Sequence, residues 1–244
     1  MTLRVMALSL VSLIAQQGLD LPVAPVKLGD PAPVVQAPPR LPEPDLDEDD
    51  DPRDTPLPTF YGEEIDAETD SLIYVLDISC SMGDHYRLDR AREEVIRSFS
   101  ALPESWEFNL IAYSAPVYWL WRSTKAATPE NKARASAWLL NWNAHSCTGT
   151  GPAVAKALSY RDNHSVVVLT DGHPNYGVPL PPKPGGHNNT QQQVLGAELH
   201  RKVIRDANLQ GARIDMFGLD TTGPTRAFCQ GVAADNGGHY VDVH

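Results

Sequence analysis

The stretch SLIYVLDISCS, residues 71–81, joins an apolar run to a cluster of oxygen-bearing side chains. A near-continuous apolar run of this length is typical of a strand covered on both faces of a parallel sheet. Asp77, Ser79 and Ser81 follow at the end of that predicted strand. Because Mg²⁺ and Ca²⁺ prefer oxygen ligands, the stretch predicts a buried strand that ends in a candidate cation site.

Strand-like and helical patterns alternate from residue 71 onward. Further strands are expected at 108–113, 116–121, 165–170, 213–219 and 239–243, the first two as a hairpin or sheet edge. Helices are expected at 88–102, 129–142, 152–160, 191–208 and 224–234. This order predicts an α/β domain with a Rossmann-like, doubly wound, mostly parallel central sheet flanked by helices.

Helical spacing also predicts which side chains face the core. In the helix at 129–142 the candidates are Ala133, Ala137, Trp138 and Leu140. In the helix at 191–208 they are Val194, Leu195, Leu199, Val203 and Ile204. Each helix is expected to bury one such stripe.

Two later segments lead to the same edge of the predicted sheet. Asp171 follows the valine-rich strand at 165–170, and Thr148 lies in the loop CTGTGP, which directly precedes a helix. In open α/β sheets, ligands bind outside the carboxyl ends of the strands. We therefore expect Thr148 and Asp171 to join the oxygen donors that follow the first strand.

These three segments resemble the von Willebrand factor A-type (VWA) domain family. The metal ion-dependent adhesion site (MIDAS) of that family reads Asp-x-Ser-x-Ser, then a threonine in a Gly/Thr-rich loop, then Asp-Gly after a central strand. The resemblance covers about residues 70–244, including the order of the elements. It implies a complete MIDAS with the metal ligands Asp77, Ser79, Ser81, Thr148 and Asp171.

The resemblance implies a divalent-cation-dependent protein-binding module that holds Mg²⁺, or Mn²⁺ or Ca²⁺. Three of the five ligands are neutral hydroxyl groups, so the cation stays electrophilic and an acidic side chain of a protein partner can complete its coordination. The loop at 174–190 is expected to set specificity. Four side chains near this edge are candidate partner contacts, namely His173, Asn175, Tyr176 and His85.

Two alternative functions are a non-catalytic subunit of a larger assembly and a metal-dependent hydrolase. Similar domains serve as non-catalytic subunits of larger assemblies, such as metal chelatases with their ATPase partners, and a cytoplasmic location would favour that role. A metal-dependent hydrolase is disfavoured, because a haloacid-dehalogenase-type phosphatase needs a second carboxylate where Ser79 stands. The sequence also contains no Gly-x-Ser-x-Gly elbow and no Walker-type loop. We therefore expect no enzyme activity.

The N-terminal part differs in composition from the rest. Residues 1–20 resemble a signal peptide, with Arg4 before an apolar run at 5–15 that is shorter than the ~20 residues a membrane-spanning helix needs. Residues 21–69 are expected to be a Pro-rich, acidic, disordered linker, with eight acidic residues and one arginine at 43–54. The remainder is only mildly acidic, so no nucleic-acid surface is expected. The expected location is extracytoplasmic, periplasmic or secreted.

Two features concern the cysteines and the end of the chain. Cys80 and Cys147 each adjoin a predicted ligand, so the fold could bring them together to pair in an oxidising compartment. Free thiols are favoured, because the geometry of a disulfide is demanding. The adhesion domains of the family continue after their last strand into a helix that transmits conformational change. Here His244 follows the last predicted strand directly, so we expect neither that helix nor its switch.

Overall fold

Strand β3 (Ser71–Asp77) lies inside the main sheet, and all seven of its residues are buried, as the apolar run predicts. The computed structural model describes residues 57–67, 69–180 and 189–244. Within them, the other strands of the sheet are β4 (Glu107–Tyr113), β5 (Val117–Trp119), β6 (Lys125–Ala126), β7 (Ser165–Thr170), β8 (Arg213–Leu219) and β9 (Tyr240–Val243).

The sheet has the order β5-β4-β3-β7-β8-β9, with β6 also pairing with β4. All pairs among β3, β4, β7, β8 and β9 are parallel, whereas β5 and β6 pair antiparallel with β4. The predicted hairpin is therefore present, and its second strand, β5, is an edge of the sheet. Because β3 and β7 are parallel neighbours, with Leu76 opposite Leu169, their carboxyl ends open at the same edge.

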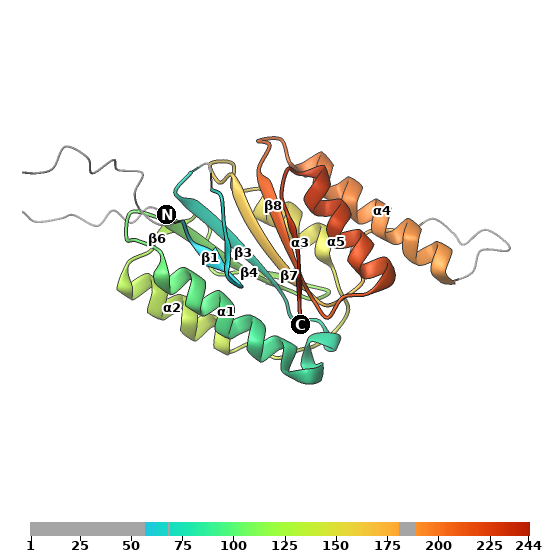
Figure 1. Cartoon of the computed structure of the whole chain (residues 1–244), viewed down its shortest axis with the longest axis horizontal. Helices are drawn as coiled ribbons and strands as arrows, with labels where there is room; N and C mark the ends of the chain where they lie inside the picture. The colour runs from blue at the N-terminus through green and yellow to red at the C-terminus, as the bar shows by residue number, and fades with distance from the viewer. Residues whose placement is uncertain (1–56, 68, 181–188) are drawn as a thin grey trace, which may run out of the picture. The chain divides into compact units, whose positions relative to one another are not determined.

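Helices cover both faces of this sheet (Figure 1). The elements are the 3₁₀ segment η1 (Cys80–Tyr86) and the helices α1 (Arg87–Ala101), α2 (Pro129–Leu140), α3 (Thr150–Ala157), α4 (Asn189–Ala207) and α5 (Gly223–Asp235). Helices α1 and α2 lie on one face, and α3, α4 and α5 lie on the other. The prediction of a doubly wound, mostly parallel sheet is confirmed.

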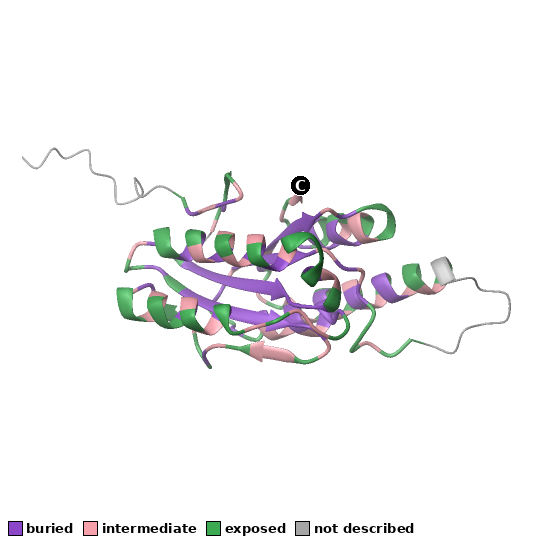
Figure 2. Cartoon of the chain, turned by 90° about the horizontal axis from the view of Figure 1, so that it is seen from below, coloured by how far each residue is buried: buried purple, intermediate pink, exposed green. Residues whose placement is uncertain are grey.

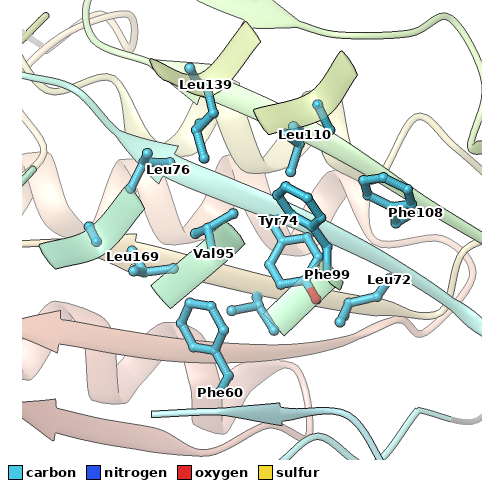
Figure 3. Close-up of a cluster of buried hydrophobic side chains, with 14 of the residues drawn as sticks. Phe60, Leu72, Tyr74, Leu76, Val95, Phe99, Phe108, Leu110, Leu139 and Leu169 are labelled. Atoms are coloured by element: carbon cyan, nitrogen blue, oxygen red, sulfur yellow. The ribbon is translucent and has the colours of Figure 1, made fainter. Parts of the chain in front are cut away.

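Each face of the sheet has its own apolar core. Along β3, Leu72, Tyr74 and Leu76 point into the core under α1 and α2, whereas Ile73 and Val75 point into the other. Figure 3 shows the first of these cores, and in Figure 2 the buried strands lie between helices whose outer faces are exposed. Because both faces of β3 are covered, the side chains between its ends are aliphatic or aromatic.

Helix α2 presents a different face to the core from the one that was predicted. Its buried residues are Ala135 and Leu139, while Ala133, Ala137 and Leu140 are exposed and Trp138 is half-buried. The i, i+4 pair 135/139 belongs to the apolar core on this face of the sheet. Three alanines and two leucines in this helix fit several helical phases, so hydropathy alone selected the wrong one.

Helix α4 packs largely through small and polar residues, together with the large apolar residue Ile204. Ala197, His200 and Ile204 are buried, whereas Val194 is half exposed. The His200 ring accepts a hydrogen bond from the Gly151 backbone at the start of α3 (N···Nδ1 2.9 Å). Close packing of α4 on α3 therefore depends on small side chains, which a search for large apolar residues overlooks. Only Ile204 of the predicted stripe is fully buried.

Packing against the core extends to residues before 70, the position at which the folded domain is expected to begin. Strands β1 (Thr59–Phe60) and β2 (Glu63–Glu64) form an antiparallel hairpin. The Phe60 side chain is fully buried, and its ring centroid lies 4.7 Å from that of Phe217. A short polar hairpin with one anchoring aromatic residue carries no periodic signal. The predicted signal peptide and most of the linker lie outside the described residues, as do residues 181–188 of the predicted specificity loop.

Among the residues that the structure describes, no helix combines the length and the apolar composition that a membrane span requires.

We expect Phe60→Ala to lower the free energy of unfolding by ~3–5 kcal/mol, because it removes a fully buried ring from a packed core. Urea unfolding of the full chain measures this change. Leu57→Ala is the matched control, because Leu57 is 39% exposed at the start of the same hairpin region, and its effect should stay within ~0.5 kcal/mol. Equal effects of the two changes would show that the hairpin is not part of the folded unit.

Candidate metal centre

Asp77, the last residue of β3, is completely buried although its side chain is a carboxylate. Its Oδ1 accepts a hydrogen bond from the Ser79 backbone N–H (2.7 Å). Its Oδ2 accepts one from the Thr170 hydroxyl at the end of β7 (2.6 Å). These two bonds join the ends of the neighbouring strands and fix the orientation of the carboxylate.

Ser79 and Ser81 continue from β3 into η1 and bring their hydroxyl groups together. The two Oγ atoms lie 3.4 Å apart. The Ser81 hydroxyl donates to Oδ1 of Asp171 (2.8 Å), which follows β7. The side chain of Asp171 is only 2% exposed, so this contact places a second buried carboxylate beside the two serines.

The loop that carries Thr148 is attached to the end of β3 through its backbone. His145 N–H donates to the Ile78 carbonyl (2.8 Å), and Cys80 N–H donates to the Ser146 carbonyl (3.0 Å). Cys80 therefore lies next to this loop through its backbone. The three cysteines are free thiols, exposed at Cys80 and Cys147 and buried at Cys229.

Thr148 lies beside Asp77 because Gly172 has no side chain. A Cβ atom at position 172 would lie 2.9 Å from Thr148 Oγ1 and 3.5 Å from Asp77 Oδ2, so any larger residue would press against the Thr148 hydroxyl. Asn175 fixes the same loop from the other side: its Oδ1 accepts from Thr148 N–H, and its own N–H donates to the Thr148 carbonyl, both at 2.9 Å. The five predicted ligands thus converge at one edge of the sheet.

The four predicted partner contacts divide into two groups. Asn175 holds the loop, and His173 Nε2 lies 2.9 Å from the Gln193 carbonyl of α4, so both have contacts within the domain. Tyr176 and His85 are exposed. Contact with a partner stays a prediction for all four.

Sequence reasoning missed Arg87 and Asp220. Arg87, the first residue of α1, donates from Nη1 to Asp171 Oδ2 (2.9 Å) and to the Ser81 carbonyl (3.2 Å), and from Nε to Asp220 Oδ2 (3.0 Å). Asp220 follows β8 directly. The rule that polar residues after parallel strands gather at one edge would have included Asp220, but no sequence pattern indicates Arg87.

Burial controls the electrostatics of the two site carboxylates. Desolvation, with a smaller contribution from nearby Asp171, raises the pKa of Asp77 to about 6, although the hydrogen bonds from Thr170 and Ser79 oppose this shift. Desolvation also raises the pKa of Asp171, although Ser81 and Arg87 oppose this effect. Both shifts mean that ionisation is costly here without a nearby cation.

The donor set fits a hard divalent cation. Carboxylate and hydroxyl oxygens surround the place where the three segments meet, and a buried carboxylate with a raised pKa is a group that a cation would stabilise. Within the described part of the chain, no group of three or more His, Cys, Asp or Glu side chains is arranged to hold a metal. A site here would therefore rely on hydroxyl ligands, and metal ligation by the five residues stays a prediction.

Solved structures of other proteins share the fold of this chain. No family model matches the sequence, and no curated protein matches it. Three similar solved structures are a von Willebrand factor type A protein from Catenulispora acidiphila (TM-score 0.55, 15% identity), the PilB minor pilin from Streptococcus sanguinis (0.54, 15%) and the pilus adhesin SpaC from Lactobacillus rhamnosus GG (0.53, 16%).

The matches cover 71%, 75% and 71% of this chain, in that order, and 38%, 59% and 28% of the other chains. This chain thus spans well under two thirds of each of these proteins. At such low identity the likeness concerns the fold alone. The described residues adopt a VWA-type fold, as the three sequence segments predict.

In the presence of a chelator, we expect Asp77→Asn to gain stability relative to the wild type as the pH rises from about 4 to about 7. The pKa of Asp77 is about 6 in the folded protein and 3.8 ordinarily, so ionisation destabilises the folded wild type over this range. The stability difference should change by ~2 kcal/mol, measured by urea unfolding at each pH.

Only the difference in unfolding free energy between the wild type and Asp77→Asn isolates the contribution of Asp77. Burial lowers the pKa of His200 to about 4, so His200 makes the stability of both proteins rise with pH between about 4 and 6.5. Asp84→Asn is the control, because Asp84 is exposed in η1. A stability difference between Asp77→Asn and the wild type that does not change with pH would contradict the prediction.

Proposed function

We propose that this chain is a divalent-cation-dependent protein-binding module, in which the five converging residues hold Mg²⁺ or Mn²⁺ and a carboxylate of a protein partner completes the coordination. The observation that carries the proposal is the meeting of two buried carboxylates and three hydroxyl groups at one sheet edge. When bound, the cation would supply an electrophilic point for the partner carboxylate.

The chain's own residues have separate roles in this proposal. Asp77, fixed by its bonds to Ser79 and Thr170, supplies a rigid carboxylate at the base of the site. Ser81 and Asp171, already hydrogen-bonded to one another, supply a hydroxyl and a second carboxylate. Thr148, held through its backbone by Asn175, supplies a further hydroxyl from a separate loop.

The outer surface of the site suits a partner. Cys80, Cys147, Asn175 and Tyr176 are exposed around the buried ligands. Two of the solved structures with this fold are a pilus adhesin and a minor pilin, which supports a role in protein interaction. The same likeness and the signal-like residues 1–20 support an extracytoplasmic location. We assign no catalytic role to the site.

We expect millimolar Mg²⁺ to raise the Tm of the wild type, and Ser81→Ala to weaken Mg²⁺ binding at least tenfold, because Ser81 both supplies an oxygen and holds Asp171. Isothermal titration calorimetry measures the affinity. The matched control is Ser159→Ala, an exposed serine at the far end of α3, which should bind Mg²⁺ like the wild type. Equal binding by all three proteins would contradict the assignment of Ser81.

Capture of partners from the native source tests the role of the cation. The wild type should retain partners in Mg²⁺ and lose them in chelator, and Asp77→Ala should retain none of them in either condition. Identical sets of bound proteins in all conditions would rule out a metal-bridged mechanism.

A further inference from the structure

Arg87 connects the candidate metal centre to Asp220, the residue that follows strand β8. One guanidinium nitrogen contacts Asp171 Oδ2 at 2.9 Å, and another contacts Asp220 Oδ2 at 3.0 Å. The side chain is 17% exposed, and that of Asp171 is 2% exposed. Charge-assisted bonds in such a shielded place are strong and directional.

These contacts divide the two oxygens of Asp171 between different partners. Oδ2 faces Arg87, whereas Oδ1 faces the Ser81 hydroxyl. Only Oδ1 therefore lies on the side of the predicted ligands. A carboxylate that is held in this way can offer a cation one oxygen but not both.

The charges of Arg87 and Arg90 also offset two of the three carboxylates in this network. Asp77, Asp171 and Asp220 would each bring a negative charge when ionised. Arg87, which Asp171 and Asp220 share, and Arg90, which contacts Asp220, each bring a positive charge. The site thus has an excess of one negative charge for a divalent cation. Ca²⁺ takes six to eight oxygen ligands, often from bidentate carboxylates, whereas Mg²⁺ needs few carboxylates and keeps several waters.

We propose that Arg87 is a specificity-determining residue of the centre: by holding Oδ2 of Asp171 it denies Ca²⁺ a bidentate carboxylate and favours Mg²⁺ or Mn²⁺. This inference rests on the proposed function, since it concerns the same cation. Arg87 acts through Asp171 and contacts no metal itself. Its removal would release Oδ2 and leave Asp171 without a charge partner, which would favour cations that accept more anionic oxygen.

The experiment is a calorimetric titration with Mg²⁺ and with Ca²⁺ alone, on the full chain. We expect Arg87→Gln to raise the ratio of Ca²⁺ affinity to Mg²⁺ affinity about tenfold. Arg87→Lys keeps a positive charge beside Oδ2, so its ratio should stay within about threefold of the wild type. Arg90→Gln is the matched control, because Arg90 lies one turn further along α1 and reaches the network only through Asp220 (3.2 Å).

Arg87→Gln removes the partner of a buried charge, so its fold without cation is checked by circular dichroism. The Ca²⁺ titration is repeated with Mg²⁺ present throughout, so that the variant need not be stable alone. An unchanged or lower ratio in Arg87→Gln, or a shift of equal size in Arg87→Lys or Arg90→Gln, would overturn the inference while the proposed function stands. If neither the wild type nor Arg90→Gln binds a divalent cation, the proposed function fails and this inference fails with it.

Discussion

The buried carboxylate of Asp77 is the constraint on which the rest of this edge depends. A charge without solvent contact must have hydrogen-bond partners, and here they come from the next loop and from the neighbouring strand β7. These partners can be in place only when β3 and β7 are parallel and in register. The geometry of the site therefore depends on the packing of the sheet, because the two apolar cores hold β3 and β7 in this register.

A second layer of contacts decides how charge is distributed around that carboxylate. Arg87 and Asp220 adjoin the site only because α1 begins, and β8 ends, at the same edge of the sheet. Asp220 has a positive φ of 51°, which aspartate tolerates better than most residues. The chain thus combines hydroxyl and carboxylate donors with a network of Arg87, Arg90 and Asp220 that offsets part of the negative charge of the site.

Prediction from the sequence succeeded where the signal was local. The β3 run and the strand at 165–170 are contiguous patterns, and the structure places both strands as expected. Prediction failed where a face had to be chosen among weak alternatives, as in α2, or where a small residue allowed close approach, as in α4. The hairpin around Phe60 was missed because its stability comes from distant aromatic rings such as Phe217.

The sequence by itself determined the order of strands and helices, the buried nature of β3 and the identity of the oxygen donors, because each follows from neighbouring residues. Only the tertiary structure decided that Arg87 would meet Asp171, 84 residues later, and Asp220, 133 residues later. Such pairs depend on which strands become neighbours and on where a helix begins above them. Long-range packing, rather than local pattern, therefore sets the charge that a cation would encounter at this edge.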